Sequence, residues 1–199
     1  MSTLVNRGWI ALLSGLFLLV SGCGYNDIQS LDEETNAAWS EILNQYQRRT
    51  DLIPNLVETV KGYAAHERET LDSVTQARTQ VAGVNATPEL LNDPNAFKKF
   101  QESQAQLSSA LTRLLAVAEA YPDLKANENF RDLQSQLEGT ENRIVVARKR
   151  YIDKIAEYNK LIRFFPTNLT AKYVLHVEVK PNFTVADEKA VSQPPSVKF

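Results

Sequence analysis

The feature of this sequence that most constrains its fold is a long helical pattern across residues 127–164. Apolar side chains recur along it in steps of three and four, which is the spacing of one face of an α-helix, and Asn127 can begin that helix. At 1.5 Å per residue the helix would reach on the order of 57 Å. It cannot bury its apolar face alone, so other helices must cover it. The face consists of Phe130, Leu133, Leu137, Ile144, Ala147, Tyr151, Ile155, Tyr158 and Ile162, with a gap at Thr140.

Three further stretches, residues 25–47, 48–81 and 96–121, have the same periodicity. The last is an almost unbroken heptad that includes one polar residue, Gln104. Turn-forming residues separate the stretches at 83–95 and at Pro122. We therefore predict an all-α fold, an elongated antiparallel bundle of about four helices.

Pro54 lies inside one of these stretches. Proline has no amide hydrogen, and its ring would clash with the carbonyl of Thr50 in a continuous helix. We expect either a sharp kink here or a new helix that begins with Asp51 as its N-cap, which would put Pro54 in the first turn.

The pattern changes after residue 165. Residues 173–179 are rich in β-branched and apolar side chains, and Pro181, Pro194 and Pro195 follow. The sequence predicts an extended C-terminal tail at 166–199, which either lies against the bundle or is loosely ordered.

The N-terminal residues have the pattern of a lipoprotein signal. Arg7 precedes an apolar run from Trp9 to Val20 that is too short to span a bilayer comfortably, and small residues then lead to Cys23. We interpret 1–22 as a signal peptide, Cys23 as the lipidated mature N-terminus, and 23–165 as the bundle. The alternative is an uncleaved signal anchor in which Cys23 is incidental. Gly24, in place of aspartate, favours delivery to a bacterial outer membrane.

Charge and cysteine content narrow the classes of function. Cys23 is the only cysteine, so the chain can form no internal disulfide and no cysteine-based metal site. Without residues 1–22, which contain Arg7 as their only charge, the net charge is 21 − 24 = −3 with the signs interspersed. This pattern does not favour nucleic-acid binding. The chain has two histidines and no phosphate-loop or serine-hydrolase motif, so we expect no metal and no cofactor.

Two sets of residues are candidate sites on the stretch that contains Pro54. A polar stripe of small side chains, formed by Asn55, Thr59, Gly62 and His66, would line up on a helix as a partner groove, or as an ordinary boundary between core and solvent. Glu67 projects onto the apolar face of the same helix, where a buried carboxylate would need a cation. Arg143, Arg148 and Lys149 are the candidate partners. The alternatives are an ion pair that only fixes helix register and a glutamate that reaches solvent.

Basic residues form a third candidate. Arg48 and Arg49, together with Arg148, Lys149 and Arg150, could face anionic lipid, or they could be solvated helix faces.

Several motifs resemble the LemA family. The first is the run from Arg48 through Asp51-Leu52-Ile53-Pro54-Asn55-Leu56-Val57 to Gly62-Tyr63-Ala64 and His66-Glu67, and the second is Tyr158-Asn159, Ile162, Phe165-Pro166 and Asn168. Ala38-Trp39 and the closing Pro195, Val197 and Phe199 extend the resemblance over almost the whole mature chain. It implies a membrane-attached, all-α bundle of roughly four helices, but it supplies no activity. One departure is Val174-Leu175-His176, where the family usually has a glycine-phenylalanine pair.

Three functional hypotheses follow. The first is a membrane-anchored scaffold or adaptor that binds an unidentified envelope protein. The second is a carrier with a lipid or small ligand in the bundle interior. The third is a hydrolase that uses Glu58 or Glu67 with His66, which would need those groups to meet in a water-accessible cleft.

Overall fold

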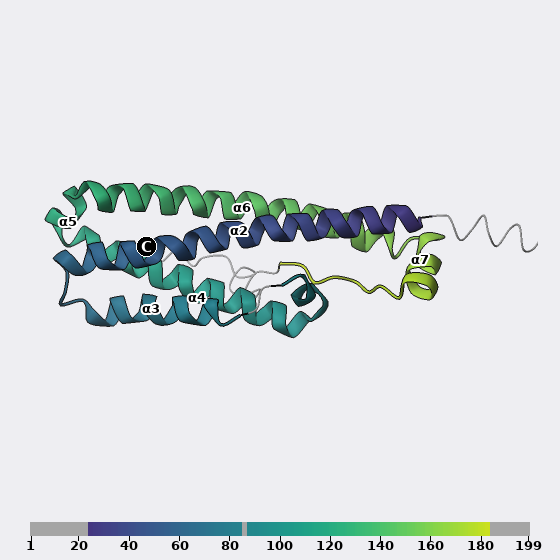
Figure 1. Ribbon diagram of the computed structural model, residues 1–199, viewed down its shortest axis with the longest axis horizontal. Coiled ribbons are helices and arrows are strands. Elements are labelled where there is room, and N and C mark those ends of the chain that lie inside the picture. Colours follow the sequence, from purple (N-terminus) through teal and green to yellow (C-terminus); the bar gives the residue numbers. More distant parts are fainter. Residues whose placement is uncertain (1–23, 85–86, 184–199) are drawn as a thin grey trace, which may run out of the picture.

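The computed structural model describes residues 24–84 and 87–183, and within them it is all-α, without a strand. The four longest helices are α2 (Tyr25–Tyr63), α3 (Arg68–Ala82), α4 (Pro94–Glu119) and α6 (Glu128–Leu161). Helices that follow one another along the chain run in opposite directions and form an elongated bundle (Figure 1). The predicted fold class is therefore confirmed. The proposed signal peptide and Cys23 lie outside the described residues. Among the helices that are described, none is both long and apolar enough to cross a bilayer.

Helix α2 passes through Pro54 without ending, so of the two alternatives at this residue the new helix that begins at Asp51 is wrong. Proline cannot donate to the carbonyl of Thr50, four residues earlier, and that carbonyl needs another donor. Arg78 on α3 supplies one, because its Nε donates to the Thr50 oxygen at 3.4 Å. The helix ends instead at Tyr63, and a turn leads into α3.

Short elements connect the long helices. The 3₁₀-helix η1 (Pro88–Asn92) precedes α4, whose first turn is capped by the Asp93 side chain, which accepts from the backbone N–H groups of Asn95 and Ala96. The helix α5 (Pro122–Ala126) precedes α6. Asn127 caps α6 by accepting from the Phe130 N–H at 3.0 Å, so the predicted start of this helix is confirmed.

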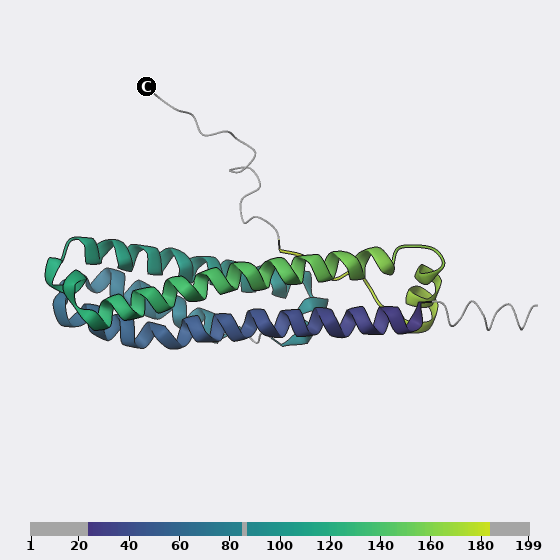
Figure 2. The ribbon, with the colours of Figure 1, turned by 90° about the horizontal axis from the view of Figure 1, so that it is seen from above.

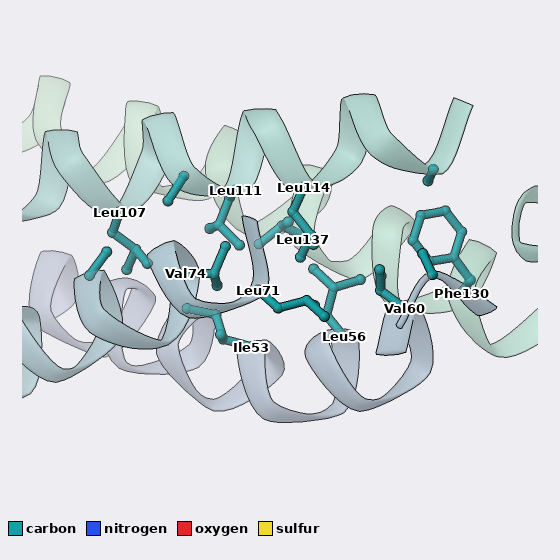
Figure 3. Close-up of a cluster of buried hydrophobic side chains, with 14 of the residues drawn as sticks. Ile53, Leu56, Val60, Leu71, Val74, Leu107, Leu111, Leu114, Phe130 and Leu137 are labelled. Atoms are coloured by element: carbon teal, nitrogen blue, oxygen red, sulfur yellow. The ribbon is translucent and has the colours of Figure 1, made fainter. Parts of the chain in front are cut away.

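Apolar side chains fill the bundle in three successive clusters. In the first, residues of all four long helices point toward one another, among them Leu56, Val74, Leu111 and Leu137 (Figure 3). The second is aromatic and centres on Trp39. The third lies where α2 and α6 extend beyond α3 and α4 (Figures 1 and 2), and its buried residues are Ile28, Tyr158, Ile162 and Ala171.

The C-terminal region covers this third cluster, and the prediction of a wholly extended tail is wrong. The chain forms α7 (Thr167–Thr170) and a π-helical turn, η2 (Ala171–Leu175), so residues 173–175 are helical. Residues 176–183, which we call the return segment, are not helical and run back along α2 and α6 (Figure 1).

Polar contacts hold the return segment against the helices. Asn159 on α6 donates to the backbone oxygen of Lys180 and accepts from its N–H, both at 3.0 Å. The Lys180 ammonium reaches α2, where it pairs with Asp32 at 2.5 Å. Phe183 then packs on Phe97 and Tyr151, with ring centroids 5.1 and 5.5 Å apart. The return segment thus takes the place that a third helix would have in this part of the bundle.

Gly24 joins the start of α2 to α7. Its φ is 88°, in the left-handed region, and a Cβ at this position would lie 2.6 Å from Cγ2 of Thr167. Both the conformation and the contact require glycine. The beginning of the described chain is therefore fixed against the turn that follows α6.

We predict that Gly24→Ala lowers the free energy of unfolding by at least about 1–2 kcal/mol, the cost of a left-handed conformation for alanine. Gly62→Ala is the matched control, because a Cβ there meets nothing within 4 Å. Inside a helix this change should stabilise by about 0.5–1 kcal/mol. Chemical denaturation of the purified variants measures both, and equal effects would contradict the close contact at Gly24.

Alkaline pH should destabilise the third cluster. Burial, with a smaller contribution from Asp32, raises the pKa of Tyr158 to about 12, whereas an unfolded tyrosine titrates near 10. The folded state therefore keeps the Tyr158 proton up to a higher pH than the unfolded state does. The stability that the protonated Tyr158 contributes is complete below about pH 10 and is lost as the pH rises from about 10 toward 12. Denaturation between pH 8 and 12 should show a steeper loss for the wild type than for Tyr158→Phe. Parallel curves would contradict the burial of the hydroxyl.

Candidate functional site

A polar layer crosses the bundle between the first and second apolar clusters. At its centre is Arg49 of α2, whose exposed fraction is 1%. One terminal nitrogen, Nη1, donates to Ser108 Oγ and to Glu141 Oε1, each at 2.8 Å, and Nη2 donates to Gln104 Oε1. The guanidinium also lies over the ring of Tyr46, 5.0 Å from its centroid. The layer thus joins α2 to both α4 and α6.

The sequence places these groups at one level because Arg49 and Gln104 occupy positions in the apolar stripes of α2 and α4, and Glu141 follows Thr140, the buried polar residue that interrupts the stripe of α6. Arg49 lies between Tyr46 and Ile53, Gln104 between Phe100 and Leu107, and Glu141 between Leu137 and Ile144; all six flanking residues are buried. A guanidinium removed from water needs charged or polar partners. The three helices can satisfy it only when these positions are aligned, so the layer specifies their register.

The electrostatics of the layer are asymmetric. The Arg49 side chain is 2% exposed and that of Glu141 is 41% exposed, so solvent screens the carboxylate and the ion pair contributes little net stability. Arg49 Nε is buried without a hydrogen-bond partner. Burial raises the pKa of Tyr46, although the nearby Arg148 and Arg49 cations oppose the shift. The layer is therefore held by hydrogen bonds more than by charge.

A groove opens over the polar layer between α4 and α6. Its first part is a cleft of about 480 Å³ that is lined by Gln104, Ser108, Val145 and Arg148 among others. A second cleft, of about 440 Å³, continues toward Leu115. Ser108 and Glu141 line both clefts, so we treat them as one feature, the α4–α6 groove.

Beside this groove α6 carries a basic strip, which we define as residues 143–150. Val145 and Val146 are 66% and 51% exposed, although both are apolar. Four cations surround them, and no acidic residue occurs between Asn142 and Ile152. Arg148 lies over the Phe183 ring at 4.4 Å. Among the described residues, no carboxylate lies within 4.0 Å of the other three cations, which are Arg143, Lys149 and Arg150.

The structure does not bring the predicted partner groove together. Asn55 and Gly62 lie on the exposed side of α2, Thr59 is half-buried, and a Cβ on Gly62 would face open space. His66 lies in the turn beyond the end of the helix, so its predicted alignment with the other three is wrong. The arrangement matches the alternative, a boundary between core and solvent.

Glu67 does not form the predicted ion pair. Because α2 ends at Tyr63, Glu67 no longer projects onto the apolar face of that helix, and it is half-buried in the turn before α3. It accepts a hydrogen bond from the Tyr121 hydroxyl at 3.1 Å, which raises the pKa of that tyrosine. Arg143 and Arg148 lie in the middle of α6, far from this end of the bundle. The buried cation that pairs with a carboxylate of α6 is Arg49, and its partner is Glu141.

The basic residues separate into two kinds. Arg48 is exposed, whereas the adjacent Arg49 is buried, so an Arg48–Arg49 cluster on the surface is a wrong prediction. Arg49 instead shares the α4–α6 groove with Arg148. Across the described residues, no group of three or more potential metal ligands occurs.

Fold and site together define the class: an all-α, elongated bundle with a polar layer at mid-length and a basic, apolar strip on the exposed side of α6. The family model described as LemA family matches residues 38–199. The chain therefore belongs to the LemA family, whose members are generally membrane-associated. A comparison with curated proteins gave no match.

We predict that Arg49→Met lowers the free energy of unfolding by about 2–3 kcal/mol, because it leaves the Gln104 amide buried without its partner. Arg48→Met is the matched control; it removes the same charge from an exposed position, so the change should stay within about 0.5 kcal/mol. Chemical denaturation measures both. The double variant Arg49→Met/Gln104→Leu should recover part of the loss, and the absence of any recovery would contradict the coupling.

Proposed function

We propose that this protein is a lipid-anchored adaptor of the bacterial envelope, which binds an acidic segment of a partner protein through the basic strip on α6. The observation that carries the proposal is the exposure of Val145 and Val146 among cations that have no carboxylate partner in the described structure. Exposed apolar groups rimmed by charge are typical of protein contacts.

The two valines give the partner two points of contact. Val145 lines the α4–α6 groove, and Val146 lines a cleft on the other side of α6 together with Glu41, Arg143 and Arg150. A partner segment that crosses α6 would cover both valines. Carboxylates on it would meet cations on each side, which favours an acidic segment and discriminates against basic ones.

The anchor is proposed to be the acylated Cys23. Two or more acyl chains on one cysteine would give stable attachment without a transmembrane helix. Gly24, the next residue, is fixed against Thr167, which supports an anchor at that end of the bundle. We propose an extracytoplasmic location, with the outer membrane favoured in a cell that has two membranes.

The carrier and hydrolase hypotheses stay predictions without a specific observation in their favour. Large side chains, among them Trp39, Tyr151 and Phe100, fill the centre of the bundle. Glu58 pairs with Lys61 at 3.6 Å on the surface, and Glu67 accepts from Tyr121. A bound lipid in the purified protein would favour the carrier hypothesis over the adaptor.

The test is site-specific photo-crosslinking in intact cells. A crosslinker at Val145 should capture one discrete partner, whereas one at Glu58, exposed on α2, should not. Lys149→Glu/Arg150→Glu should reduce the yield at least fivefold by repelling acidic groups. Lys98→Glu/Lys99→Glu, which makes the same charge change on an exposed part of α4, should leave the yield unchanged.

The same crosslinker in a Cys23→Ala chain tests the anchor. We expect the partner to be lost or strongly reduced, because the unanchored chain is no longer held near it. Equal capture at Val145 and Glu58 would overturn the proposed binding strip. A crosslinking yield that does not change when the charges on α6 are reversed would overturn it as well. Full capture by the unanchored chain would overturn the role of the anchor alone.

A further inference from the structure

The end of the bundle that contains α7 exposes an unusual set of apolar side chains. Phe165 is 80% exposed and Tyr173 is 65% exposed, which leaves two aromatic rings largely in water. Three more exposed residues on the same short stretch extend the set: Phe164, Leu169 and Val174. We call residues 164–174 the aromatic end. Exposed single residues are common in proteins, but a gathering of this kind marks a contact surface.

Cations accompany these aromatic rings. Lys160 Nζ lies 5.3 Å from the centroid of Phe164, and Lys172 Nζ lies 5.3 Å from that of Tyr173. Arg163 adds a third cation, and no acidic residue occurs from position 158 to 177. On the facing helix α2, the first turn contains one acidic residue, Asp27. The aromatic end, together with the adjacent Lys160 and Arg163, is therefore positively charged as well as apolar.

The path of the chain places this surface beside the residue that follows the proposed anchor. Gly24 is in contact with Thr167, so the first described residue lies beside the aromatic end, where α2 begins (Figures 1 and 2). Only Cys23 separates Gly24 from the 22 residues interpreted as the signal peptide. An acyl chain on Cys23 would hold the nearest surface of the bundle at the bilayer, and that surface is residues 164–174.

We propose that the aromatic end is a second membrane contact, in which Phe164, Phe165 and Tyr173 enter the headgroup region while Lys160, Arg163 and Lys172 meet lipid phosphates. Aromatic and basic side chains have this division of roles at bilayer interfaces. Anionic lipids strengthen such contacts through basic residues at the surface. Anchor and aromatic end together hold the bundle upright, with α5 and the α2–α3 turn far from the bilayer. This inference rests on the proposed lipid anchor at Cys23.

The experiment uses the full-length protein in vesicles of phosphatidylethanolamine and phosphatidylglycerol. An environment-sensitive fluorophore is attached to Phe165→Cys and, as the matched control, to Tyr63→Cys, an exposed aromatic position at the opposite end of the bundle. We expect a blue-shifted emission at position 165 and at least twofold quenching by lipids that carry a quencher in the upper acyl chain. Position 63 should show neither.

Each outcome separates the membrane contact from the anchor. In the parent chain, an acylated Cys23 has no thiol and takes no label; labelling there would overturn the lipid anchor itself. Without parental labelling, a water-like, unquenched signal at position 165 overturns the membrane contact and leaves the anchor intact. A blue shift without lipid quenching also overturns it, because the surface would then be covered by protein.

Discussion

The fold depends on the alignment of one buried guanidinium with three helices. Apolar stripes of period three and four can slide past one another by a heptad at modest cost, because leucine then meets leucine again. Arg49 allows no such shift, because its donors must reach Ser108, Gln104 and Glu141. Next to it, the carbonyl that Pro54 leaves free accepts from Arg78 and brings α3 to the same level. All four long helices are therefore aligned at mid-bundle.

This alignment leaves α2 and α6 longer than their neighbours at one end, and the rest of the C-terminal region follows from that. The uncovered apolar residues, such as Ile28 and Tyr158, need a cover that two helices cannot provide. The turn after α6, the π-helical turn and the return segment supply it, held by Asn159 and Lys180. The same arrangement leaves Phe165 exposed two residues before Thr167, which contacts Gly24, so the exposed aromatic end is a consequence of how the third cluster is closed.

Periodicity was sufficient to predict the class of fold and the helices at 96–121 and 127–164, because each long helix buries one apolar face. It could not predict the path through Pro54, since the donor that makes this path acceptable, Arg78, comes from another helix. The placement of Glu67 failed for a related reason: it assumed that the helix continues through Glu67, whereas α2 ends at Tyr63.

The polar layer was partly visible in the sequence, although its members were not connected. Gln104 interrupts one heptad, the stripe of the longest helix has a gap at Thr140, and Arg49 occupies a stripe position between Tyr46 and Ile53. Each irregularity is ambiguous alone, and whether the three residues meet depends on the register of the helices.

The proposed upright orientation also separates the two basic surfaces, the basic strip on α6 and the aromatic end. From Arg148 to Leu161, where α6 ends, the helix advances 13 residues, or about 20 Å, well beyond a Debye length of about 8–10 Å. Anionic lipid would then attract the aromatic end, while the basic strip on α6 stays available to an acidic protein.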